Sequence, residues 1–124
     1  MALESNLTCV TLEAGGDLSA GQFRFVELAA DAQVDLVAAA GGDAVGVLQN
    51  DPSAAGRAAT VAVLGVSKVV AGAAVAAGAR VQSDDEGRAL AAASGDVVLG
   101  RALTAASAAG EVIEVLLLST HVTA

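Results

Sequence analysis

Val69–Arg88 reads VVAGAAVAAGARVQSDDEGR and contains no aromatic residue and no proline. Its alanines favour a helix, because alanine has the highest intrinsic helix propensity. Its glycines oppose one, since each glycine in a helix interior costs about 1 kcal/mol relative to alanine. The segments between Gly72, Gly78 and the turn 83–87 have the length of strands. We therefore interpret this stretch as strands joined by turns, and the spacing of the other glycines along the chain predicts the same structure elsewhere.

An earlier stretch, Gly15–Phe25 (GGDLSAGQFRF), repeats this pattern, and Leu18–Gly21 matches Val75–Gly78 at a distance of 57 residues. Further matches follow at distances of 53 or 54 residues: Gly42-Asp43 with Gly95-Asp96, Gly46 with Gly100, Gly56 with Gly110, Val61 with Val115, and Val63 with Leu117. A chain rich in Ala, Gly and Val can produce such matches by chance. A true duplication predicts two similar β units that close on each other in one barrel or sandwich.

Composition limits how the core can be built. The 124 residues predict one domain, and they include two Phe, one Met, no Trp and no Tyr, although 55% are hydrophobic. The core must therefore consist of Val, Leu and Ala, which bury less area than aromatic side chains. Such a fold needs close backbone contacts or a partner subunit.

Charge and cysteine content exclude several classes of function. Six basic and fourteen acidic residues give a net charge of −8, which disfavours nucleic-acid binding because a polyanion is repelled. Cys9 is the single cysteine, so we expect no internal disulfide and no cysteine-based metal cluster. We expect Cys9 itself to be a half-buried strand residue.

The N-terminal sequence MALESNLTCV lacks the basic and apolar regions of a signal peptide. The apolar run 112–118 is interrupted by Glu114 and is far shorter than the ~18 residues of a membrane span. We therefore expect no membrane partner, and we expect the chain to be made and used on the cytoplasmic side.

The predicted fold is all-β: a single compact barrel or sandwich of short strands over residues 15–120, with an extended N-terminal arm at 1–14 and a short tail at 121–124. Alternation in Gln22–Leu28 places Phe23 and Phe25 on one side of a strand. The nearly continuous apolar run Ala58–Val66 predicts a central strand that is covered on both faces.

Catalytic patterns are nearly absent. His121 is the only histidine and lies near the end of the chain, so a Ser/His/Asp arrangement is improbable. Gly41–Gly46 lacks the Lys-Ser/Thr of a phosphate loop. Asp84–Glu86 lacks the spaced ligands of a calcium loop and is expected to be an exposed hairpin tip. We assign Asp31, Asp35, Glu111 and Glu114 to the solvent side, and we predict no catalytic, cofactor-binding or metal site.

The order of several motifs resembles the capsid cement, or head decoration, proteins of tailed bacteriophages. The resemblance runs from about Gly21 to Leu118. Its recognisable parts are Val45-Gly46-Val47-Leu48, the block Gly65–Gly72, Ala77-Gly78 with the turn Asp84–Arg88, and Gly100-Arg101-Ala102-Leu103. It implies a small all-β structural protein without a cofactor that binds the outer surface of an assembled head, commonly as a homotrimer at three-fold positions, and stabilises the major capsid protein shell.

In that family the N-terminal segment often extends to neighbouring subunits. This implies that residues 1–14 contact the capsid or another copy by adding a strand to an exposed sheet edge. The candidate contact residues are Leu3, Leu7, Val10 and Leu12. An alternative is a β-clip-like module that binds a saccharide or another small molecule, suggested by the pattern at Ala74–Gly78. The scarcity of aromatic residues opposes it, and an enzyme is the third and most remote class.

Overall fold

The computed structural model describes residues 6–124, and of residues 119–122 only the backbone. The described chain is all-β, as predicted. None of it belongs to a helix long and apolar enough to span a bilayer. The nine strands are β1 (Leu7–Ala14), β2 (Phe25–Ala30), β3 (Gln33–Leu36), β4 (Gly46–Leu48), β5 (Ala58–Val70), β6 (Arg80–Ser83), β7 (Ala89–Ala91), β8 (Val97–Ala102) and β9 (Val112–Thr123).

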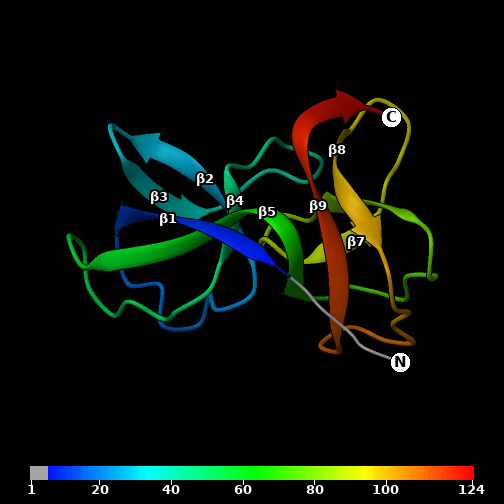
Figure 1. Ribbon diagram of the computed structural model, residues 1–124, viewed down its shortest axis with the longest axis horizontal. Helices are drawn as coiled ribbons and strands as arrows, with labels where there is room; N and C mark the ends of the chain where they lie inside the picture. The colour runs from blue at the N-terminus through cyan, green and yellow to red at the C-terminus, as the bar shows by residue number, and fades with distance from the viewer. Residues whose placement is uncertain (1–5) are drawn as a thin grey trace.

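The first five strands close on themselves. The hydrogen-bonded order is β1-β3-β2-β4-β5, and β5 pairs again with β1. The β1–β3 pair is parallel, whereas the other pairs of this unit are antiparallel. This closed unit, the first barrel, forms the lobe at the left of Figure 1.

The second half repeats the same order of pairing. Strand β5 continues into it and pairs with β9, and the order proceeds through β8 and β6 to β7. A parallel bridge between Ala71 and Ala89 connects β7 back to the end of β5. The order β5-β7-β6-β8-β9 therefore corresponds strand by strand to β1-β3-β2-β4-β5. This second barrel is the other lobe of Figure 1, and β5 is shared between the two.

Matching hydrogen bonds confirm the duplication. The Gly56 amide donates to the Ala14 carbonyl, and the Gly110 amide donates to the Ala71 carbonyl, both at 2.8 Å. The predicted pairing of Gly42 with Gly95 is wrong by one residue. Gly41 and Gly95 both have positive φ, 77° and 89°, so these two are the equivalent turn glycines, 54 residues apart.

The core consists of two clusters. Small aliphatic residues fill the first barrel: Ala14, Leu18, Val26, Val34, Leu48, Ala59 and Val61. The larger cluster extends from the second barrel into the first and includes Phe25, which is 1% exposed. Phe25 is the largest fully buried side chain among the described residues. A single aromatic ring therefore connects the two halves.

Three local predictions were wrong. Phe23 does not share a strand face with Phe25, because it precedes β2 with a positive φ of 64° and is half-buried. Its ring lies 5.8 Å from the Lys68 amine nitrogen. Cys9 is exposed rather than half-buried. Strand β5 is central, but Leu64 is 46% exposed, so β5 is not covered along both faces.

The segment expected to be an arm is, from Leu7 onwards, the strand β1 of the same sheet. It pairs with β5 from Leu7↔Gly65 to Glu13↔Ala58. Its partner β3 covers only Glu13 and Ala14. Along residues 7–12, strand β1 therefore has one paired edge and one edge without a partner strand among the described residues.

Candidate interaction surface

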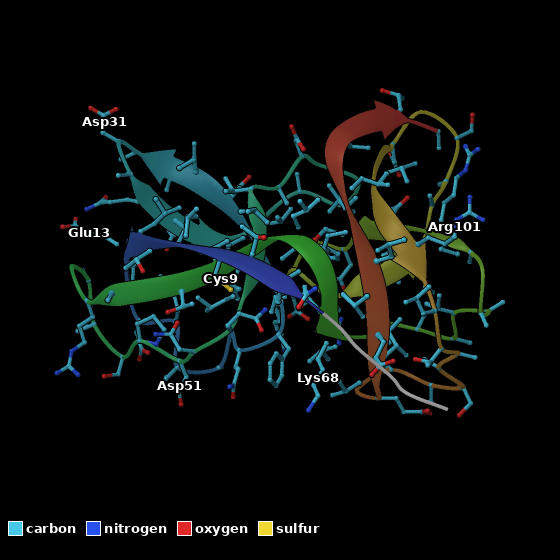
Figure 2. The ribbon with its side chains drawn as sticks, in the orientation of Figure 1. Cys9, Glu13, Asp31, Asp51, Lys68 and Arg101 are labelled. Carbon is cyan, nitrogen blue, oxygen red and sulfur yellow. The ribbon has the colours of Figure 1, made fainter. Side chains whose placement is uncertain are left out.

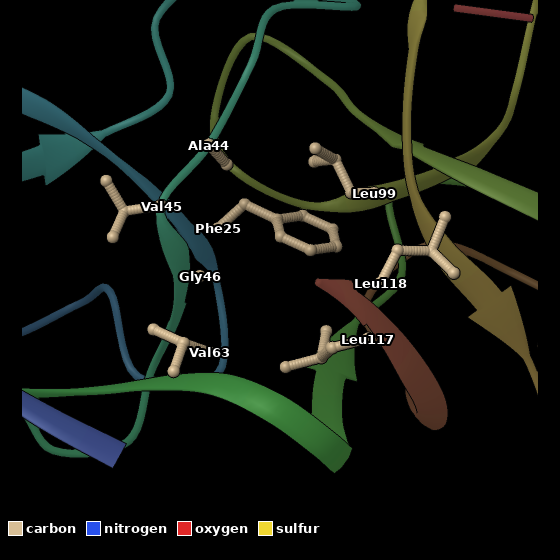
Figure 3. Close-up of a pocket in the computed structure, with 8 residues that line it drawn as sticks. All are labelled: Phe25, Ala44, Val45, Gly46, Val63, Leu99, Leu117 and Leu118. Atoms are coloured by element: carbon tan, nitrogen blue, oxygen red, sulfur yellow. The ribbon is translucent and has the colours of Figure 1, made fainter. Parts of the chain in front are cut away.

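A pocket that lies between the two barrels is too small for a ligand. Figure 3 shows the Phe25 ring inside it. The lining is mostly apolar, and the volume of about 10 Å³ corresponds to roughly one water molecule. Small-molecule sites usually have volumes of about 300 Å³ or more. This cavity therefore gives no support to a saccharide or cofactor site.

The acidic turn 84–88 is only partly the solvated tip that the sequence predicted: Asp85 and Glu86 are exposed, whereas Asp84 is buried. Asp84 is 6% exposed. Its Oδ1 accepts hydrogen bonds from the Glu86 and Arg88 amides at 2.8 and 2.7 Å, and its Oδ2 forms an ion pair with Arg88 Nε at 2.8 Å. Carboxylate oxygens of Asp84, Asp85 and Glu86 lie within 4.8 Å of one another. Both Asp84 oxygens, however, already bind within the turn.

This turn also docks the second barrel on the first. The Gly87 carbonyl accepts a hydrogen bond from the Phe25 amide at 2.7 Å, and the Glu86 carbonyl accepts one from Arg24 Nη1 at 3.2 Å. A Cβ atom at Gly87 would lie 2.6 Å from the Phe25 carbonyl oxygen. The turn is thus a structural contact between the halves.

Replacement of Asp84 by alanine is expected to lower the free energy of unfolding by about 2–3 kcal/mol, because two amides of the turn and the Arg88 guanidinium lose the buried carboxylate that they bind. Denaturant titration followed by circular dichroism would measure this loss. Asp85 is exposed, so Asp85→Ala should change stability by less than about 0.5 kcal/mol. Equal effects of the two substitutions would contradict the structural role of Asp84.

The remaining acidic candidates do not assemble a reactive site. Asp31 is exposed at the β2–β3 turn, and Asp35 is half-buried on β3 beside Gly15. The pKa of Glu111 is lowered by hydrogen bonds from Ser107, whose hydroxyl donates to it at 2.5 Å. The side chain of His121 lies outside the described residues.

The predicted contact residues occupy different environments. Leu7 and Val10 on β1 are 37% and 40% exposed. Leu12 is half-buried against the core of the first barrel. Leu3 lies outside the described residues. Leu7 and Val10 therefore remain the accessible members of the set, next to the unpaired edge of β1.

A second exposed apolar area lies on the outer face of the β5–β9 pair. Cross-strand partners Val66↔Leu116 and Val70↔Val112 share this face. Val112 and Leu116 are 52% and 41% exposed. The sequence analysis missed this area, because alternation in 112–118 predicts two faces but does not show which of them remains uncovered.

A family model described as "Phage cement protein" matches residues 5–117. The chain belongs to the phage cement protein family. This family consists of structural phage proteins, so a cement protein has a capsid-associated structural role and a location in the virion. No curated protein matches the chain in sequence.

The fold of this cement protein is similar to a solved structure, "The crystal structure of head fiber gp8.5 N base in bacteriophage phi29". The match has a TM-score of 0.71 at 18% identity and covers 96% of the cement protein and 100% of the phi29 chain. At this identity the similarity concerns the fold. It includes both barrels, since nearly the whole chain is aligned.

Proposed function

We propose that this protein binds the outer surface of an assembled phage head, as a homotrimer at three-fold positions, and stabilises the shell of the major capsid protein. Membership of the cement family is the observation that carries the proposal. The net charge of −8 also suits a site outside the shell, away from packaged nucleic acid. Synthesis in the host cytoplasm belongs to the same proposal.

The unpaired edge of β1 supports a contact by strand addition. The segment Asn6–Leu12 (NLTCVTL) has no charged residue and no proline, and residues 6–11 are exposed. Natural edge strands usually carry charges or prolines that prevent such pairing. An extended segment of a capsid subunit or of a neighbouring copy would bond to the free backbone groups, and many copies would add their weak contacts.

Incubation of the purified protein with undecorated heads, followed by electron cryo-microscopy, tests the proposal directly. We expect added density on the outside of the shell at three-fold positions. Sizing coupled to light scattering tests the trimer, and a saccharide-dependent shift in melting temperature would favour the small-molecule alternative. Heads that gain no density would exclude the capsid-binding function.

Val10→Asp is expected to weaken head binding at least about tenfold, because a charge in the middle of an open edge opposes strand addition. Co-sedimentation with heads would measure it, with circular dichroism as the test of folding. Val10→Thr keeps a β-branched, uncharged side chain and should bind like the original protein. Deletion of residues 2–13 is unsuitable as a test, because β1 is a wall of the first barrel. Full binding by the folded aspartate variant would exclude the β1 edge.

A further inference from the structure

Positive charge collects on one face of the second barrel. In β5, β6, β8 and β9 the Lys and Arg residues are Lys68, Arg80 and Arg101, and the single acidic residue is Glu114. Lys68 lies directly opposite Glu114, Arg101 lies opposite Leu116, and Arg80 lies opposite Arg101. Cross-strand partners and alternate residues of a strand share a face. All of these side chains therefore project from the same side of the sheet.

The apolar area described above lies on this same side, since Glu114 alternates with Val112 and Leu116 along β9. An apolar centre with a charged rim is the usual composition of a protein–protein interface. We call this surface the basic face, formed by Val66, Lys68, Arg80, Arg101, Val112 and Leu116, with Glu114 as its single acidic residue.

The charges of the basic face form no ion pair within the described chain. Arg80 and Arg101 are exposed and directly opposite each other, and like charges in such positions are unfavourable. The described ion pairs involve Arg88 only. The Arg101 guanidinium reaches a carbonyl, that of Gly78, at 3.4 Å. A carboxylate-rich partner surface would therefore relieve a repulsion that the single chain retains.

The first barrel presents such a surface at the opposite end of the molecule. Glu13 on β1 and Asp31 at the β2–β3 turn are exposed and line one shallow hollow. Figure 2 shows Glu13 and Asp31 at one end of the long axis and Arg101 towards the other. We call this surface the acidic end, formed by Glu13 and Asp31.

We propose that the basic face of one copy docks on the acidic end of the next copy. This inference rests on the self-association proposed above and names the surfaces that mediate it. The two patches have opposite charge, the basic face adds exposed apolar residues, and the patches lie towards opposite ends of the molecule. Contacts between unlike patches are head-to-tail, and they form a ring when the rotation between copies closes. The trimer is the ring that we expect.

Sedimentation velocity at low and at physiological salt tests the contact. The original chain should associate at low salt and dissociate partly as salt rises, because rim charges are screened. Arg80→Glu with Arg101→Glu should weaken association at least about tenfold, and Glu13→Arg with Asp31→Arg should do the same. A chain with all four exchanges should associate again, and an equimolar mixture of the two double variants should form mixed pairs.

The two double variants control for overall charge, because the first changes the net charge from −8 to −12 and the second changes it to −4. If general repulsion governed association, the second variant would associate more strongly than the original chain, and the inference would be wrong. An original chain that stays monomeric at low salt would also overturn the inference. So would failure of both rescues, in which neither the folded four-exchange variant nor the mixture of the two double variants associates.

Binding to heads is measured separately. A basic-face variant that keeps self-association but loses head binding would assign the face to the shell, whereas a chain that associates but never binds heads would contradict only the proposed function.

Discussion

Gly46→Ala is expected to lower the free energy of unfolding by about 3 kcal/mol or more. A Cβ atom on Gly46 would overlap the carbonyl oxygen of Ala62 on the neighbouring strand β5 and would lie 2.9 Å from the Val61 side chain. A backbone oxygen cannot move away by a rotamer change, so β4 would have to separate from β5. Denaturant titration followed by circular dichroism would measure the loss.

The duplication supplies an internal repeat of this experiment. Gly100 on β8 is the equivalent residue, and its added Cβ would lie 2.5 Å from the Leu116 carbonyl oxygen. Gly100→Ala should therefore be about as damaging as Gly46→Ala. Gly16 is the matched control, because a Cβ atom added to it would have Asp35 Oδ1 as its nearest neighbour, at 3.8 Å. Gly16→Ala should change stability by less than about 1 kcal/mol, and three equal effects would contradict the close strand approach.

Phe25→Ala is expected to lower the free energy of unfolding by about 3–5 kcal/mol, the range for removal of a fully buried aromatic ring. The ring lies between the two barrels, and the small residues around it cannot fill the space that it would leave. Thermal and denaturant unfolding would measure the loss, and hydrogen exchange would show whether the contact between the barrels opens first.

Phe23→Ala is the matched control, because it removes the same side chain two residues earlier. Phe23 is half-buried, and its described ring contact is the one with Lys68. An exposed cation–π contact contributes about 0.5–1 kcal/mol. A loss at Phe23 as large as the loss at Phe25 would contradict the placement of the two rings.

Most of the fold class could be predicted from local patterns. Glycines at short intervals exclude long helices, and apolar alternation between them favours strands. The order of the glycines also indicated the duplication, which the repeated strand order and the bonds of Gly56 and Gly110 confirm. The one-residue error at Gly42 arose because two adjacent glycines are equivalent in sequence, whereas only Gly41 has positive φ.

The site was less predictable, because its residues are brought together by long-range pairing. The sequence singled out Leu7 and Val10 but placed them on a free arm, whereas they lie on β1, which pairs with residues 58–65 of β5. Nothing in the spacing of Arg80, Arg101 and Lys68 indicates that they share a face. Only the register of β5, β9, β8 and β6 places them together.

The stretch Val69–Arg88 shows which features follow from the sequence alone and which depend on the tertiary structure. Sequence alone determined its turns and strands, the acidic character of the chain and the resemblance to cement proteins, because these depend on composition, order and φ preferences of neighbouring residues. Tertiary structure decided that Asp84 faces inward, that the turn contacts Phe25, and that Arg80 lies beside Arg101. Those outcomes depend on the register between strands far apart in the chain, which no local preference specifies.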